Sequence, residues 1–123
     1  MNLLTLSFIL ISVLLSVVAQ ILLKQGMSSA SVQGAIHSGG ITAVMVVLTN
    51  FFVLGGLAAY VSSAGIWLVV LSKVDVSKAY PFVGLGFIGT MLFAYWFLNE
   101  PISAGKIIGT VLIVAGIWFI SNN

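Results

Sequence analysis

The sequence lacks cysteine, and its four strongly basic residues are all lysines, so it lacks arginine as well. The absence of cysteine excludes disulfides, thiol chemistry and cysteine-based zinc or iron–sulfur sites. The absence of arginine excludes the planar side chain that holds a phosphate with two hydrogen bonds. Any anion bound by this chain must therefore meet a lysine, a hydroxyl group, an amide or a helix end. We expect no metal site and no cofactor.

Charge of either sign is also scarce. Only 5% of the 123 residues are charged, against about 25% in soluble domains. No acidic residue or lysine occurs between Gln25 and Ser72, between Ala79 and Asn99, or after Lys106. Stretches of that length cannot form the wetted surface of a globular protein, which excludes a soluble enzyme, a nucleic-acid-binding protein and a disordered chain. The composition predicts an integral, multi-pass membrane protein without a catalytic role.

Four apolar runs are long enough to cross a bilayer, whose hydrocarbon core of roughly 30 Å needs about 20 helical residues. We therefore expect an all-α membrane protein with four transmembrane helices in a single domain, residues 1–123. The expected spans are about 3–23, 51–71, 79–98 and 102–120. The first run resembles a signal peptide in its position, but no lysine or arginine precedes it and it is long, which favours a retained span.

Residues Ile41–Leu71 form an apolar run that is too long for one span, since a single helix there would measure about 46 Å. The most polar dipeptide within it is Thr49-Asn50, which predicts a break at that point. We therefore expect a span after this break and, before it, a short helix at the membrane interface, Ile41–Leu48, in a segment of about 36–49. The alternative is a span that starts with the run itself and breaks at Gly55-Gly56.

The remaining connections carry most of the charge. Residues Ser28–Gly40 are rich in serine and glycine and predict a loop, in which we expect His37 to be solvated. Because four spans place both termini on one side, two pairs of lysines lie on opposite sides of the membrane: Lys24 and Lys106, against Lys73 and Lys78. Equal numbers of lysines on the two sides leave the orientation open.

Polar residues follow one face of each of the first two spans. On the first span they lie within about 120° of arc: Thr5, Ser12, Ser16, Gln20 and Lys24. On the second they form a stripe about 60° wide: Gly56, Tyr60, Ser63 and Trp67. Polar groups that face lipid would be unsatisfied, so these stripes face other helices or a wet cavity. Hydrogen bonding between helices and a substrate cavity both remain open, and the size of the larger polar side chains favours the cavity.

Residues Gly84–Gly89 match G-x-G-x-x-G, the dinucleotide-binding pattern. That pattern requires a preceding strand and an acidic residue about 20 positions later in a βαβ unit. Here it lies inside an apolar helix, so we reject a dinucleotide site. The glycines instead predict close helix approach and easy bending of this span.

The last span carries the G-x-x-x-G pattern at Gly105 and Gly109, and Gly116 lies two turns further along the same face. Small residues at this spacing allow two helices to meet backbone to backbone. We expect this face to form a dimer interface, with packing inside one subunit as the alternative.

Both acidic residues lie at connections between spans. Glu100 precedes Pro101 near the start of the last span, where a helix N-terminus favours a carboxylate. A structural role and a role in binding both remain open for Glu100. Asp75 lies between Lys73 and Lys78 in a short connection, which predicts a solvated charge.

Taken together, these segments resemble the drug/metabolite transporter superfamily in its four-span, small-multidrug-resistance-like form. The resemblance rests on segments that occur in the family's order: Ala19–Lys24, Trp67 and Leu71, Val76–Pro81, Leu98–Pro101, and Gly109–Gly116. It covers the chain except for Gln25–Thr49. The resemblance implies a four-helix transporter fold and a last helix that forms a dimer interface.

The family has a branch of proton-coupled exporters of cationic drugs, which carry a glutamate in the middle of the first helix. Depending on the alignment, that glutamate falls at Ser16 or at Gln20, and neither of these residues titrates. An aromatic residue of those exporters is here Val83. Without the carboxylate the cavity lacks a proton carrier and a counter-charge for a cation, which argues against this branch.

A second branch resembles this chain in its Gln-x-x-x-Lys ending and its Ser-x-Ala-Tyr joint: the paired subunits that flip 4-amino-4-deoxy-L-arabinose-phosphoundecaprenol across the bacterial inner membrane. The resemblance implies a lipid-linked phosphosugar substrate and a homodimer or a heterodimer with a similar four-span subunit. Lys24 would bind the phosphate, Gln20 and Tyr80 the head group, and Trp67 would stack on the sugar. The full expected binding set is Ser16, Gln20, Lys24, Tyr60, Ser63, Trp67, Tyr80 and Glu100. The alternatives are a proton-coupled exporter of small cations or metabolites that uses Glu100 as its acid, and a non-transporting partner subunit.

Overall fold

A computed structural model describes residues 2–123, and the described part of the chain is helical without a strand. Its elements are α1 (Leu3–Met27), α2 (Ala30–Ser38), α3 (Gly40–Thr49), α4 (Phe51–Leu71), α5 (Val76–Ala79), the 3₁₀ turn η1 (Tyr80–Phe82), α6 (Val83–Leu98) and α7 (Ala104–Ser121). Four helical stretches are long and apolar enough to cross a membrane: α1, α4, the run Val76–Leu98 and α7. The expected all-α, four-span, multi-pass fold with a shorter apolar helix after the first span is therefore confirmed.

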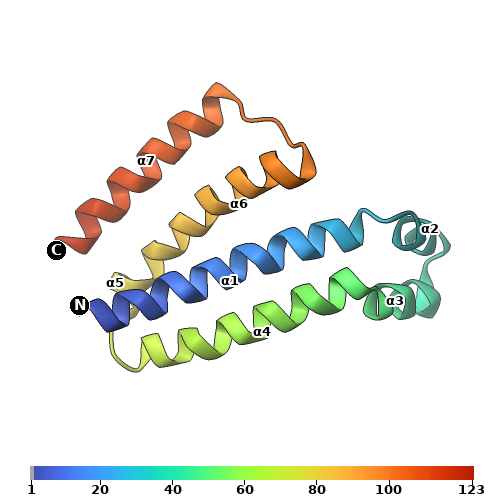
Figure 1. The fold of residues 1–123 in the computed structure, drawn as a ribbon, viewed down its shortest axis with the longest axis horizontal. Coiled ribbons are helices and arrows are strands. Elements are labelled where there is room, and N and C mark those ends of the chain that lie inside the picture. The colour runs from blue at the N-terminus through green and yellow to red at the C-terminus, as the bar shows by residue number, and fades with distance from the viewer. Residues whose placement is uncertain (1) are drawn as a thin grey trace.

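The four spans lie in the order α4, α1, α6, α7 across the molecule (Figure 1). Helices α1 and α4 pack along their length, and glycine makes this approach close. A Cβ atom added at Gly56 would lie 2.8 Å from the Leu23 side chain and 3.0 Å from the Ala19 carbonyl oxygen. Small residues at such contacts let two membrane helices approach backbone to backbone.

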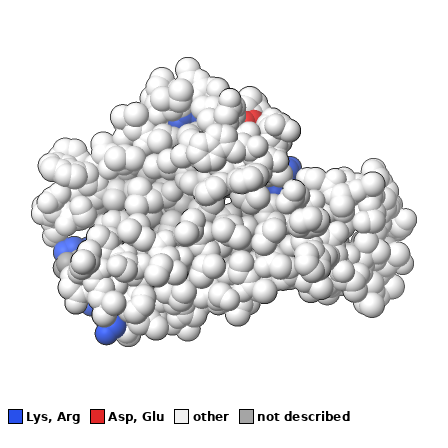
Figure 2. Space-filling model, in the orientation of Figure 1, with Lys and Arg blue, Asp and Glu red and all other residues white. Residues whose placement is uncertain are grey.

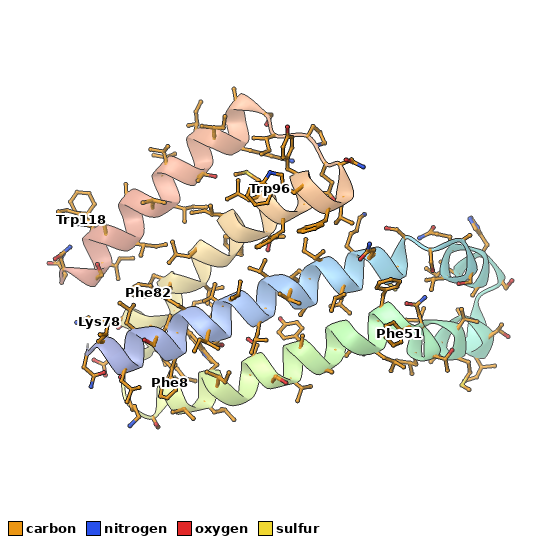
Figure 3. All side chains as sticks on the ribbon, viewed as in Figure 1. Phe8, Phe51, Lys78, Phe82, Trp96 and Trp118 are labelled. Carbon is orange, nitrogen blue, oxygen red and sulfur yellow. The ribbon has the colours of Figure 1, made fainter. Side chains whose placement is uncertain are left out.

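The apolar core lies at the end of the molecule where α1 begins and α4 ends. Its fully buried members include Ile9 of α1 and Val70 of α4, with Ala79 of α5 between the spans. Phe8 and Phe82 pack against this cluster and lie at the same end in Figure 3. The first span, the second span and the start of the third are therefore joined by packing at this end of the molecule.

The third span begins with an irregular joint. Helix α5 leads into the 3₁₀ turn η1, where Pro81 lies in the first turn, the position at which its missing N–H costs least. From there α6 runs unbroken past its glycines. A Cβ atom added at Gly89 would lie 3.2 Å from the Val17 side chain, and one at Gly84 would lie 2.9 Å from that of Ile113. The expected close helix approach is confirmed, and bending of this span stays a prediction.

The prediction of a loop over Ser28–Gly40 is wrong, because most of it forms α2. Ser29 caps this helix by accepting a hydrogen bond from Val32 N at 3.4 Å, and Val32 and Ala35 are buried. Gly39 and Gly40 then take φ values of 69° and 67°, which turn the chain into α3. The serine and glycine content therefore marked a cap and a turn around a short helix.

The break predicted at Thr49-Asn50 is confirmed, and the alternative break at Gly55-Gly56 is wrong. Asn50 Oδ1 accepts hydrogen bonds from Phe52 N at 3.0 Å and Val53 N at 3.1 Å, so Asn50 is the N-cap of α4. Helix α4 then continues through both glycines to Leu71. The cap satisfies backbone donors that an uncapped helix start would leave without partners.

Candidate functional site

A cavity of about 890 Å³ is lined by all four spans. Most of its lining is apolar, and the polar groups come from a small number of side chains. Seven of the eight residues expected to bind substrate line it: Ser16, Gln20, Tyr60, Ser63, Trp67, Tyr80 and Glu100. The eighth, Lys24, is exposed in the last turn of α1 and is absent from the lining. A largely apolar pocket with few polar groups is typical of a small-molecule site.

Two aromatic side chains form a corner at one end of the cavity. The rings of Trp67 and Tyr80 meet edge to face, with centroids 6.4 Å apart and planes 70° to each other. Trp67 also packs against the core cluster, which fixes its position, whereas Tyr80 is 61% exposed. Aromatic rings held at a cavity wall offer an apolar face and, for tyrosine, a hydroxyl group to a ligand.

The serines of the two polar stripes are used largely for structure. Ser12 Oγ donates to the Ser63 carbonyl oxygen at 2.9 Å, and Ser63 Oγ donates to the Ser12 carbonyl oxygen at 2.7 Å. Ser16 Oγ donates to the Val13 carbonyl oxygen at 2.7 Å. Both interpretations of these stripes therefore hold. The serine pair forms hydrogen bonds that join α1 to α4, and the side chains of Gln20 and Tyr60 remain exposed at the cavity.

The charged groups of the cavity lie at the connection between α6 and α7. Glu100 is half-buried, and Lys106 Nζ donates to the Pro101 carbonyl oxygen at 2.7 Å. Ser103 caps α7 by accepting from Lys106 N at 3.3 Å, which holds the lysine in the first turn. Because a neutral carbonyl does not compensate an ammonium charge, Lys106 can attract an anion into the cavity. Figure 2 shows the charged side chains of the visible face gathered toward the ends of the spans.

Lys106 is a charged residue of the cavity that the sequence does not single out for binding, because there the lysine matters only as a charge that bears on orientation. A usable signal existed: Lys106, Thr110 and Ile113 recur at the spacing of one helix face, and all three line the cavity. No group of three or more His, Cys, Asp or Glu residues that could hold a metal ion occurs in the part of the chain that the structure describes.

The glycines of α7 lie largely outside any packed contact. A Cβ atom added at Gly109 or at Gly116 would meet no other atom within 4 Å, and one at Gly105 would meet only Ser103 Oγ at 3.8 Å. Gly109 also lines the cavity. The face expected to form a dimer is thus open along α7, in contrast to the glycines of α6.

Comparison with known proteins gives one matching family and several similar proteins. The EamA-like transporter family matches residues 47–122. A probable 4-amino-4-deoxy-L-arabinose-phosphoundecaprenol flippase subunit ArnF from Proteus mirabilis (strain HI4320) is 35% identical over 118 residues, which cover 90% of this chain and 86% of the relative. The ArnF protein of the same description from Photorhabdus laumondii is 35% identical over 127 residues, with coverage of 92% and 93%.

A relative described as the ArnE subunit is similar as well. The protein from Erwinia tasmaniensis is 38% identical over 85 residues, which cover 69% of this chain and 74% of the relative. No solved structure is significantly similar to the chain.

Proposed function

Because this chain belongs to the EamA-like transporter family, we propose that it moves the head group of a polyprenyl-phosphate-linked sugar across a bacterial inner membrane, as a subunit of a flippase. The observation that carries the proposal is the cavity, which combines aromatic and polar side chains with one lysine and has no carboxylate on α1. The polyprenyl tail would stay in lipid while the head group passes through the protein.

The relatives are described as probable subunits of a flippase for an aminosugar phosphate lipid, whose head group carries an amine and a phosphate. The cavity offers a partner of opposite sign for each group, Glu100 for the amine and Lys106 for the phosphate. Lys24 was the residue expected to bind the phosphate, and its place outside the lining supports giving that role to Lys106. As the head group moves along the cavity, Gln20, Tyr60 and Tyr80 would bind sugar hydroxyl groups, and Trp67 would stack on the ring.

The chain lacks the acidic residue on α1 that proton-coupled exporters of cationic drugs use. Ser16 and Gln20, the two positions at which the glutamate could fall, both line the cavity, and neither side chain can carry a proton between the two sides. One observation supports a second candidate function, the export of a small cation in exchange for protons. Glu100 is an acid that lines the cavity and could carry the proton in such an exchange.

We propose that the protein works as a dimer, either with itself or with a similar four-span subunit. Two features support this: relatives are described as subunits of two kinds, and Gly109 and Gly116 leave one face of α7 open to the backbone of another helix. A chain that only supports an active partner remains the third candidate, and it would have the same open face.

We also propose that α3 lies at the membrane interface, as expected from the sequence. Helix α1 measures about 38 Å and α4 about 32 Å at 1.5 Å per residue, so each fills the hydrocarbon core and leaves the α2–α3 hairpin at its edge. The outer face of α3 is an apolar stripe with exposed fractions between 49% and 74%: Ile41, Val44, Met45 and Leu48. The exposed residues of α2 include Gln33 and His37, so the hairpin has a polar and an apolar side.

Reconstitution into liposomes tests the transport function. Vesicles would carry a short-chain polyprenyl-phosphate aminosugar in both leaflets, and a membrane-impermeant, amine-reactive reagent would be added outside. With the protein present, we expect the modified fraction of the lipid, measured by mass spectrometry, to rise from the outer-leaflet share toward completion. Modification that stays at the level of protein-free vesicles would refute the flippase, and proton flux driven by small cations would support the second candidate. Activity that requires a co-expressed relative would exclude the homodimer.

A further inference from the structure

The cavity has two chemically different ends that are too far apart to hold one head group at once. Tyr80 precedes α6 and Glu100 follows it, and both line the same cavity. The 16 residues of α6 between them measure about 24 Å at 1.5 Å per residue. A monosaccharide phosphate is far shorter than this, so the Trp67–Tyr80 corner and the Glu100–Lys106 end cannot grip it together.

We propose, building on the flippase function above, that the head group occupies two stations in succession. The first station is the charged end, with Lys106 on the phosphate and Glu100 on the amine. The second is the aromatic corner of Trp67 and Tyr80 near the other end of the spans. Both stations belong to one cavity, which extends along most of the length of α6.

The side chains between the two ends are suited to a moving polar group. Ser16 and Gln20 of α1, Tyr60 of α4 and Thr90 of α6 line the cavity between the stations, and they are neutral. Neutral hydroxyl and amide groups can exchange hydrogen bonds with a sugar without holding its charges. They provide a polar track through an otherwise apolar lining.

The two stations differ in electrostatics. Among the described residues that line the cavity, Lys106 is the one cation, and it belongs to the charged end. The lysine nearest to the aromatic corner in sequence, Lys78, lines a separate surface pocket with Asp75 and Phe119, and in Figure 3 it lies at the end of the molecule away from the α6–α7 connection. A head group that carries both a phosphate and an amine finds a partner of opposite sign for each at the charged station, and none at the aromatic station. It therefore binds more tightly at the charged station, which we assign to loading, and more weakly at the aromatic station, which we assign to release.

Kinetics of flipping in proteoliposomes separate the two stations. Initial rates would be measured against the mole fraction of the short-chain aminosugar phosphate lipid. For Lys106→Met we expect the half-saturating lipid fraction to rise about tenfold or more, because a charge-assisted hydrogen bond to the phosphate is lost. For Tyr80→Leu we expect a lower maximal rate with an unchanged half-saturating fraction. Tyr80→Phe should restore part of the rate, because it keeps the ring but loses the hydroxyl group.

Lys73→Met serves as the matched control, since it removes an exposed lysine outside the cavity and should leave both parameters unchanged. The two-station proposal is overturned if Tyr80→Leu and Lys106→Met raise the half-saturating fraction alike, because they would then contribute to one site. It is also overturned if Tyr80→Leu changes neither parameter. Absence of flipping by the wild-type protein would instead refute the flippase function itself, so the two failures are distinguishable.

Discussion

The first span and the last span of this protein are both apolar helices, yet they are packed very differently. Helix α1 has seven buried residues and contacts α4 along its length, whereas α7 has one, Ile117. Figure 1 shows α1 in the middle of the layer and α7 at its edge. The difference shows that α1 and α4 form the fixed scaffold of the cavity, while most of the surface of α7 is left for lipid or for another subunit.

The same contrast holds for glycine, which the two regions use in opposite ways. Gly26 and Gly56 lie in the packed contact between α1 and α4, where there is no room for a methyl group. Gly109 and Gly116 lie on α7 with nothing near them. Glycine is thus needed for the subunit's own packing in the first case, and in the second it keeps a surface open.

The largest effect is expected for Gly26→Ala. Its Cβ atom would lie 2.7 Å from Asn50 Oδ1 and 2.9 Å from the Val53 backbone nitrogen, so the cap of α4 would have to move. We expect a loss of about 2 kcal/mol in the free energy of unfolding, measured by tryptophan fluorescence in detergent. Gly34→Ala, which meets nothing within 4 Å, is the control and should be neutral or stabilising. Equal stability of the two variants would contradict the packed scaffold.

Next in size is the effect of Gly116→Leu on assembly. A Cβ atom at position 116 meets no other atom of the subunit within 4 Å, so we expect unchanged monomer unfolding. The dimer should be weakened about tenfold or more, which corresponds to roughly 1.4 kcal/mol. Light scattering in detergent or single-molecule photobleaching in vesicles would measure it. Val111→Leu changes an exposed position on another face of α7 and should leave the dimer intact. Loss of the dimer in both variants, or in neither, would mean that the glycine face is not the interface.

A smaller effect is expected at the α2–α3 hairpin, where two labelled positions should differ in their exposure to lipid and to water. The chain has no native cysteine, so Met45→Cys and His37→Cys can each carry a single nitroxide label in proteoliposomes. We expect the label at position 45 to collide mainly with oxygen, which partitions into lipid, and the label at 37 mainly with a water-soluble nickel complex. If position 45 reacts like position 37, α3 lies in water; if neither reagent reaches it, another protein surface covers the stripe.

The smallest effect is expected from the serine pair that joins α1 to α4. Because the hydroxyl groups of Ser12 and Ser63 bond to each other's carbonyl oxygen atoms, a double-mutant cycle with alanine should give a coupling energy of about 0.6 kcal/mol in unfolding. A coupling of zero would mean that apolar packing alone holds the scaffold.

The sequence predicted the spans well because composition and length determine them. The Thr49-Asn50 break was predictable for a local reason, since an asparagine before an apolar run can cap the helix that follows. Five of the seven binding candidates that line the cavity lie on the first two spans, where the period of a helix places them on one face of each span, and those faces had to avoid lipid.

The differences between the expected and the observed positions share a physical cause: the pattern of one helix face does not reveal which residues lie opposite to it. Lys24 continues the polar face of α1 but is absent from the lining of the cavity, whereas Lys106 lines it from the first turn of α7. Helix α2 was missed because its serines and glycines are typical of loops, while the burial of Val32 and Ala35 depends on tertiary contacts.

Lipid binding by the purified protein tests the central claim most directly. Native mass spectrometry in mild detergent would compare a short-chain polyprenyl-phosphate aminosugar with the same polyprenyl phosphate without sugar and with phosphatidylglycerol. We predict a retained adduct for the aminosugar lipid that exceeds both other lipids and falls in Lys106→Met. Equal adducts for all three lipids, unchanged by Lys106→Met, would show that the protein merely carries anionic lipid on its surface and would contradict a cavity built for a lipid-linked sugar.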